Sequence, residues 1–237
     1  MFADPMVRTM TLVALALVIV FLATVIGVLL SGITARTGPR TLSEKELAVA
    51  GAAVRKGGAS SSTYGEYVAA LIAEGQYAQA QSVIDQGKAA APDTSTAEFS
   101  VAEVRLHSAQ KEYQQSISLA DKAQKQIEAV HKATIEGGGL KAKRAIISGL
   151  PDNWYILALL KADAYKGLGD WAKAVKEFDA YIGGNPGAAD ILIDRGNAKI
   201  AAKDTAGAEA DFKAALKFVP GDKEALQGLA KIGAANK

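Results

Sequence analysis

Two histidines, His107 and His131, are the side chains of this sequence best suited to acid–base or metal chemistry near neutral pH. The sequence contains no cysteine, which excludes disulfides, thiolate nucleophiles, iron–sulfur clusters and thiolate zinc sites. His131 is followed four residues later by Ile135, so it has no acidic partner on the same face of a helix. We therefore predict no catalytic residue, no metal site and no enzyme activity.

Phosphate and nucleic-acid sites are not indicated either. The three glycines at 137–139 lack the lysine and the serine or threonine of a phosphate-binding loop, and they follow no predicted strand. We interpret them as a hinge and predict no cofactor. The 27 basic and 25 acidic residues are interspersed along the chain, which argues against a surface for nucleic acid.

Residues 9–31 are predicted to form a transmembrane helix after a short tail at 1–8. The stretch Thr9–Leu30 carries no charge, and as a helix it would span about 33 Å, the thickness of a bilayer core. A cleaved secretory signal is the alternative, but the apolar region of such signals has roughly 7 to 15 residues. Arg8 precedes the segment and Arg36 and Arg40 follow it, so the charges leave open which side of the cell membrane holds the C-terminal domain.

Residues 32–60 are predicted to be a linker that contains one short helix. Ser43 and Glu46 have the spacing of a capping box, which predicts a helix from Glu44 to about Lys56. The glycine- and serine-rich stretch that follows is typical of a flexible tether. The packed domain is therefore expected to begin near Ser61.

The segments 155–188 and 189–222 repeat one pattern. The offset between them is constant at 34 residues, the length of one segment. The offset pairs Ala174 with Ala208, Phe178 with Phe212, Ala180 with Ala214, and Pro186 with Pro220. A 34-residue period is typical of a helix–turn–helix unit whose apolar face is covered only when neighbouring units stack on it.

This segment resembles the tetratricopeptide-repeat (TPR) family. The family's characteristic positions are occupied in order by Tyr165, Gly169, Asp170, Trp171, Ala174, Phe178 and Pro186. The next unit has Lys203 and Thr205 where glycine and an aromatic residue are usual, so we expect its turn to be recast around Asp204 as N-cap. The resemblance implies an all-α fold, a solenoid of about four helix–turn–helix units. Units 1–2 are expected over 61–126, units 3–4 over 153–222 and a capping helix over 223–237.

Residues 127–152 interrupt the phase of the repeats. Ile127 and Val130 continue the helical pattern of the second unit, which predicts an extended helix. After the glycines, a small amphipathic helix is expected with the apolar residues Leu140, Ile146, Ile147 and Leu150 and the basic residues Lys141, Lys143 and Arg144. Packing of this helix on the chain's own repeats is the favoured interpretation, and contact with a membrane surface or a partner is the alternative.

The resemblance also implies where a partner would bind. First helices of TPR units line a concave face that holds a peptide or a helix of another protein. The candidates for contact are Glu98, Val101, Arg105, Leu159, Asp163, Lys166, Asp190, Ile193 and Asn197. His107 falls at the position equivalent to Tyr165 and is predicted to be a packing residue.

We therefore predict a membrane-anchored scaffold or assembly factor that binds a partner protein through a TPR groove. An accessory structural subunit of a membrane or envelope complex is the alternative. A secreted soluble TPR protein and a metal-dependent enzyme are more remote.

Overall fold

The structure, a computed structural model, describes residues 42–57, 59–90 and 96–235. The predicted tail at 1–8, the predicted transmembrane helix at 9–31 and the first part of the predicted linker lie outside these ranges. Among the described helices, none combines the length and the apolar character needed to cross a bilayer. The chain divides into two compact units, Met1–Lys45 and Glu46–Lys237, and the packing described below belongs to the second.

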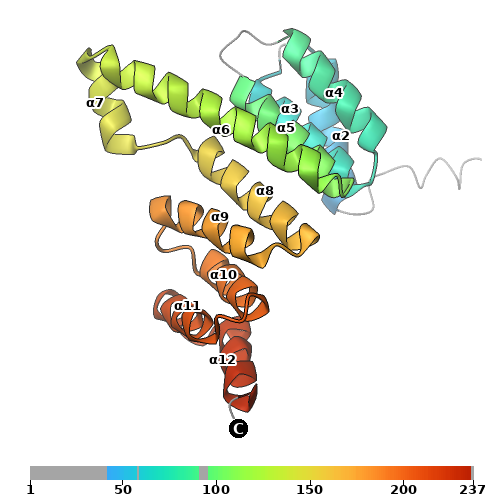
Figure 1. The fold of residues 1–237 in the computed structure, drawn as a ribbon. Coiled ribbons are helices and arrows are strands. Elements are labelled where there is room, and N and C mark those ends of the chain that lie inside the picture. The colour runs from blue at the N-terminus through green and yellow to red at the C-terminus, as the bar shows by residue number, and fades with distance from the viewer. Residues whose placement is uncertain (1–41, 58, 91–95, 236–237) are drawn as a thin grey trace, which may run out of the picture. The chain divides into compact units, whose positions relative to one another are not determined.

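The described residues form eleven helices and no strand, so the predicted all-α fold is confirmed for them. The helices are α2 (Leu42–Arg55), α3 (Ser61–Ala73), α4 (Tyr77–Ala90), α5 (Thr96–Ala109), α6 (Tyr113–Glu136), α7 (Gly139–Ser148), α8 (Asp152–Leu168), α9 (Trp171–Gly184), α10 (Ala189–Ala201), α11 (Thr205–Phe218) and α12 (Lys223–Ala235). Four pairs, α3/α4, α5/α6, α8/α9 and α10/α11, each pack internally and on the next pair (Figure 1). The last helix, α12, packs on α10 and α11 as a cap.

Each pair turns between its two helices at a residue in the left-handed region. These residues are Gly75, Lys111, Gly169 and Lys203, with φ between 62° and 75°. Glycine adopts this conformation freely, whereas for other residues it costs about 1–2 kcal/mol. Asp204 caps α11 as expected, because its side chain accepts a hydrogen bond from the Gly207 amide. The expectation that the turn is recast is wrong, since Lys203 retains the left-handed conformation that Gly169 has in the preceding unit.

Large aromatic rings opposite glycines hold the repeat cores together. Phe99, Phe178 and Phe212 are at most 2% exposed. A Cβ atom added to Gly228 of α12 would lie 2.5 Å from the Phe212 ring, and one added to Gly196 of α10 would lie 2.8 Å from it. Because these glycines lack a side chain, α10 and α12 both approach the ring that α11 carries.

Helix α2 belongs to the packed core, which differs from its expected place in the linker. Ala50 and Val54 are buried with Tyr64 and Tyr67 of α3. Gly51 makes this approach possible, since a Cβ atom there would lie 2.9 Å from the Tyr67 ring. The packed unit therefore begins before Ser61, where α3 starts.

The insertion at 127–152 leaves the stack of pairs uninterrupted. Helix α6 runs for 24 residues, so the predicted extension of the second helix is confirmed. The short helix α7 then packs on α6, and α8 returns to pack on both α5 and α6. In α7, Ala142 is buried but Leu140 and Ile146 are 81% and 63% exposed. The interpretation that α7 packs on the repeats thus holds for Ala142 and is wrong for these two larger side chains.

Candidate partner-binding surface

A buried cation, Lys161 of α8, joins the second and third pairs of helices. Its Nζ lies 2.7 Å from Asp121 Oδ1 of α6 and 2.8 Å from Glu177 Oε1 of α9, and it donates a hydrogen bond to Gln124 Oε1. Burial alone would lower the pKa of Lys161, but the hydrogen bonds to Asp121 and Glu177 raise it above its ordinary value. The residue is therefore charged at neutral pH although it is 8% exposed.

The same arrangement recurs one repeat later around Arg195 of α10. Its Nη1 lies 2.6 Å from Asp179 Oδ1 of α9. Its Nε and Nη2 donate to the two carboxylate oxygens of Asp211 of α11 at 2.9 and 2.5 Å. Lys161 and Arg195 are one repeat length apart in the sequence, as are Glu177 and Asp211, so one repeat position carries one interaction.

The charges are reversed where the first pair meets the second. Glu103 of α5, at the repeat position of Lys161, forms an ion pair with Lys88 of α4. We call these contacts of Lys88, Glu103, Asp121, Lys161, Glu177, Asp179, Arg195 and Asp211 the ion-pair ladder. The ladder fixes how each first helix sits on the preceding pair and thereby which residues reach the surface.

The nine residues that were predicted to contact a partner differ in how deeply they are buried. Val101 and Ile193 are 7% and 5% exposed in the core, so the prediction that they contact a partner is corrected. Leu159 packs against the core around Phe178. Four of the predicted residues are exposed, namely Arg105, Asp163, Asp190 and Asn197, and two are half-buried, Glu98 and Lys166. The Oε2 atom of Glu98 is buried and has no hydrogen-bond partner among the described residues.

Three carboxylates and one ammonium group, from α8, α10 and α12, act on the Asp194 carboxylate. Lys166 Nζ lies 3.0 Å from Asp163 Oδ1 and 4.0 Å from Asp194 Oδ1. Burial raises the pKa of Asp194, Lys166 opposes this rise, and the neighbouring charges of Asp163, Asp190 and Glu224 add to it. We call Asp163, Asp190, Asp194 and Glu224 the acidic face. Its charge exceeds that of its single lysine, so it attracts cations.

Sequence reasoning missed two members of the acidic face, although signals for both were present. Glu224 follows Asp190 by one repeat length, so the two occupy the same repeat position. Asp194 follows Asp190 by four residues, which places them on one side of α10. The spacing of these carboxylates in the sequence, by one repeat length or by four residues, could therefore have grouped them.

Asp194→Asn is expected to raise the melting temperature at pH 7. A raised pKa in the folded state means that Asp194 stabilises the fold below pH 3.8, its ordinary pKa, and that this contribution is lost as pH rises through the raised value. At neutral pH the ionised carboxylate is therefore unfavourable, and a neutral amide of the same shape relieves it. The gain should amount to a few degrees at most, since 1 kcal/mol corresponds to about 2–4 °C in a chain of this size.

Calorimetry of the wild type and D194N at pH 7 and near pH 3 checks this expectation. The difference should vanish near pH 3, where Asp194 is protonated. Glu209→Gln is the control, because Glu209 forms only an exposed pair with Lys213 and such pairs contribute little. A lower melting temperature for D194N than for the wild type at pH 7 would contradict the assignment.

His107, the histidine that was predicted to pack, contacts two polar side chains. His107 Nδ1 lies 2.6 Å from Glu112 Oε2, and its Nε2 lies 3.3 Å from Gln115 Nε2. Both ring nitrogens therefore face side chains of the same repeat. Within the described part of the chain, no group of three or more histidine and carboxylate side chains is placed to hold a metal ion.

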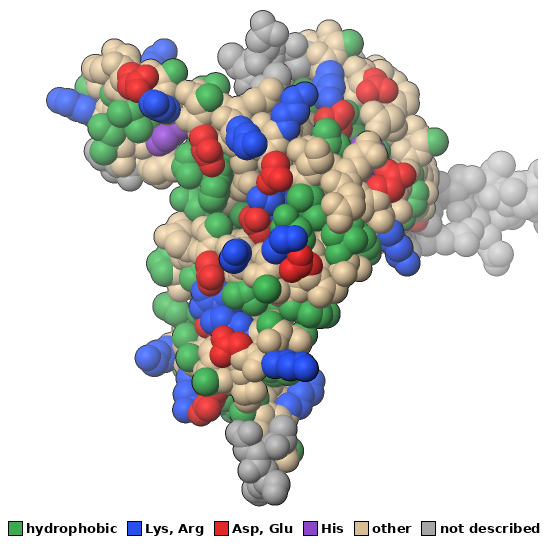
Figure 2. Space-filling model, in the orientation of Figure 1, with side chains coloured by type: hydrophobic (Ala, Val, Ile, Leu, Met, Phe, Trp, Pro, Cys, Tyr) green, Lys and Arg blue, Asp and Glu red, His purple; other side chains and the backbone are tan. Residues whose placement is uncertain are grey.

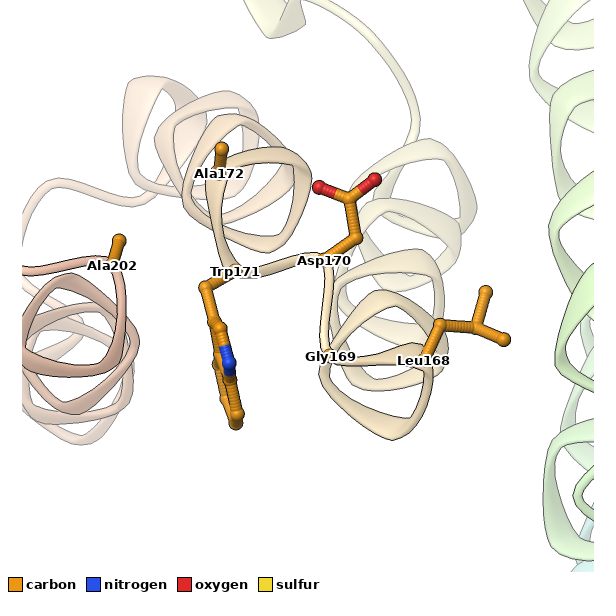
Figure 3. Close-up of a pocket in the computed structure, with 6 residues that line it drawn as sticks. All are labelled: Leu168, Gly169, Asp170, Trp171, Ala172 and Ala202. Carbon is orange, nitrogen blue, oxygen red and sulfur yellow. The ribbon is translucent and has the colours of Figure 1, made fainter.

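A shallow hollow of about 480 Å³ lies at the turn between α8 and α9. Leu168, Gly169, Asp170, Trp171 and Ala172 line it with Ala202 from the next repeat (Figure 3). The Asp170 carboxylate accepts a hydrogen bond from the Lys173 amide and lies 2.6 Å from Lys173 Nζ, and these interactions hold its pKa below the ordinary value. With Oδ1 capping α9 and Oδ2 paired with Lys173 Nζ, this carboxylate is not set up for acid–base chemistry.

Comparison with protein families identifies the repeat. Residues 159–223 match the family model of the tetratricopeptide repeat. The repeats of this region are therefore similar to the tetratricopeptide repeat. The match includes α9, α10 and α11 completely, together with most of α8, and so covers the acidic face except Glu224. The four TPR-like pairs and their cap form the helical solenoid that the sequence predicted.

Solved structures also resemble the chain. MamA residues 41 to the end, from Desulfovibrio magneticus RS-1, is 15% identical with a TM-score of 0.49, and the alignment covers 82% of this chain and 96% of that one. YrrB, a TPR protein described as having an unusual peptide-binding site, is 15% identical with a TM-score of 0.32, with 76% and 97% covered. No curated protein matches the sequence.

Proposed function

We propose that this chain is a membrane-anchored protein-binding module whose acidic face takes a positively charged segment of a partner protein. The observation that carries the proposal is the grouping of Asp163, Asp190 and Glu224 near Asp194, whose pKa is raised by burial and by these charges although Lys166 Nζ lies 4.0 Å from its Oδ1. A lysine or arginine from a partner would relieve this repulsion, so the face is less stable empty than occupied. Catalysis has no comparable support among the described residues.

The membrane attachment in this proposal rests on the uncharged segment at 9–31. Its length suits a bilayer core, and confinement to a membrane raises the effective concentration of the repeats near other membrane proteins. An assembly factor and an accessory subunit would both use the same face. Either side of the membrane is compatible with the proposed binding.

The test uses the full chain in lipid nanodiscs made of the zwitterionic lipid phosphatidylcholine, titrated with fluorescent nine-residue peptides of arginine or of glutamate. The arginine peptide should bind and the glutamate peptide should not. A variant with Asp163→Asn, Asp190→Asn, Asp194→Asn and Glu224→Gln should bind the arginine peptide about tenfold more weakly or worse, since each exposed ion pair contributes about 0.2–1 kcal/mol. Affinity should also rise as pH increases through the raised pKa of Asp194, because the bound cation favours the ionised carboxylate.

A second variant with the same change in net charge provides the control. It neutralises exposed carboxylates on other helices, with Glu66→Gln, Asp85→Asn, Glu136→Gln and Glu209→Gln. This variant should bind the arginine peptide nearly as well as the wild type. Equal weakening by both sets of substitutions would show attraction to net charge alone and would refute a site on the acidic face.

A further inference from the structure

The end of α6 and the whole of α7 form a helical corner beside the stacked pairs. Figure 1 shows α7 at the far end of α6, beyond the part of α6 that packs on α8. Glycines with positive φ bound the corner: Gly138 precedes α7, Gly139 is its first residue and Gly149 follows it. Glycine at these positions lets a ten-residue helix leave and rejoin the solenoid over short turns.

Large apolar side chains at this corner are exposed. Val130 of α6 is 67% exposed, Leu140 of α7 is 81% exposed and Ile146 of α7 is 63% exposed. Ala142 is buried against the rest of the molecule, so α7 has an attached side and a free side. Exposed aliphatic side chains lose contact with water only if something covers them.

The free side of α7 is also basic. Lys141, Lys143 and Arg144 are exposed, form no ion pair among the described residues, and share α7 with no acidic residue. At 100° per residue, Leu140 projects about 160° away from the buried Ala142, with Arg144 about 40° to one side and Lys143 about 60° to the other. On the side of α7 opposite Ala142, the apolar residue Leu140 therefore lies between two cations, Lys143 and Arg144. Figure 2 shows blue and green side chains together at this end of the molecule, with an acidic side chain among them.

We propose that α7 lies on an anionic membrane surface. Leu140 enters the boundary between headgroups and acyl chains, while Lys141, Lys143 and Arg144 pair with lipid phosphates and carboxylates. An exposed apolar residue flanked by cations suits contact with a membrane interface. The absence of an acidic residue from α7 favours a surface of uniform negative charge over a protein surface of mixed charge.

The contact is weak when α7 acts alone, because ten residues cover little area and one aliphatic side chain inserts. A second attachment to the same bilayer, such as the proposed anchor at 9–31, would make it effective. The acidic face takes no part in it. Peptide binding and membrane contact can therefore fail independently.

The absence of cysteine from the chain allows a site-specific test. The full chain with Ser148→Cys, labelled with a polarity-sensitive fluorophore, is placed in nanodiscs of phosphatidylcholine or of phosphatidylglycerol. Ser148 is exposed at the end of α7 and is not a proposed contact residue. Emission should shift to the blue in phosphatidylglycerol alone, and nitroxide groups on the lipid acyl chains should quench it.

Two variants of the labelled chain show which side chains are responsible. Lys141→Gln, Lys143→Gln and Arg144→Gln together should lower the ratio of docked to free α7 about 100-fold, since each basic residue near an anionic surface contributes roughly fivefold. Leu140→Ser should abolish quenching from the acyl chains. A label at Lys213→Cys on α11 serves as the control and should not respond to either set of substitutions. Far-ultraviolet circular dichroism should be unchanged in both variants, because the substituted residues are exposed.

The same emission in both lipids would overturn the proposal. So would a blue shift that survives the triple glutamine variant, or one that follows protein concentration in detergent without lipid, since the latter would make a second copy of the chain the occupant. Binding of the arginine peptide to the same labelled chain in phosphatidylcholine nanodiscs shows separately whether the acidic face works.

Discussion

Arg195→Met should lower the free energy of unfolding by about 3–5 kcal/mol, the effect of removing one member of a buried ion pair. Arg195 donates to both carboxylate oxygens of Asp211, whose side chain is 4% exposed. After the substitution, Asp211 keeps only Lys199 as a cationic partner, with Nζ 2.9 Å from its Oδ2. Methionine fills much of the same volume, so the loss reports the charge and not a cavity.

Chemical denaturation of the full chain in mild detergent, followed by helical circular dichroism, measures the change. Lys213→Met on α11 is the matched control, because Lys213 is 61% exposed and pairs only with Glu209 one turn away. It should change stability by less than about 0.5 kcal/mol. Similar losses in the two variants would contradict a structural role for the ion-pair ladder.

Phe212→Ala should lower the free energy of unfolding by a similar amount, about 3–5 kcal/mol. The ring is fully buried and lies against Gly196 of α10 and Gly228 of α12. Neither glycine has a side chain that could move into the space, so the cavity would remain open. Helix α12 should detach first, and its amide hydrogens should exchange faster than those of α8.

Phe218→Ala on the same helix provides the comparison for Phe212. Phe218 is 54% exposed, so its truncation removes little buried area and should change stability by less than about 1 kcal/mol. Hydrogen exchange and chemical denaturation of both variants measure the two effects. If Phe212→Ala were no more destabilising than Phe218→Ala, the packing of α12 as a cap would be incorrect.

Much of the fold could be predicted from the period of the sequence. Buried residues such as Phe178 and Phe212 recur one repeat length apart because each repeat places the same side chain against the same neighbours. The place of α2 could not be predicted in this way. Its residues Ala50 and Val54 are small, and their burial depends on the close approach of Gly51 to Tyr67, a contact that no local pattern encodes.

The candidate site was harder to predict than the fold because it depends on helix rotation. One residue along a helix turns the side chain by about 100°, so a small error in counting exchanges a core residue for a surface one. Ile193 was predicted to contact a partner and is buried, whereas its neighbour Asp194 belongs to the acidic face. The ion-pair ladder fixes this rotation, and its partners lie on different helices.

The reversed charge at Glu103 bears on how such an array can grow by gene duplication. A copied third unit would place Lys161 on its first helix against Asp179 on the preceding second helix, where Arg195 now stands. A copied second unit would place Glu103 against Asp121 of its own duplicate, where Lys161 now stands. A copied fourth unit would place Arg195 against Lys213, which occupies the repeat position of Asp179. Duplication is thus permitted at the third unit and penalised at the second and the fourth, so the array can lengthen from its middle.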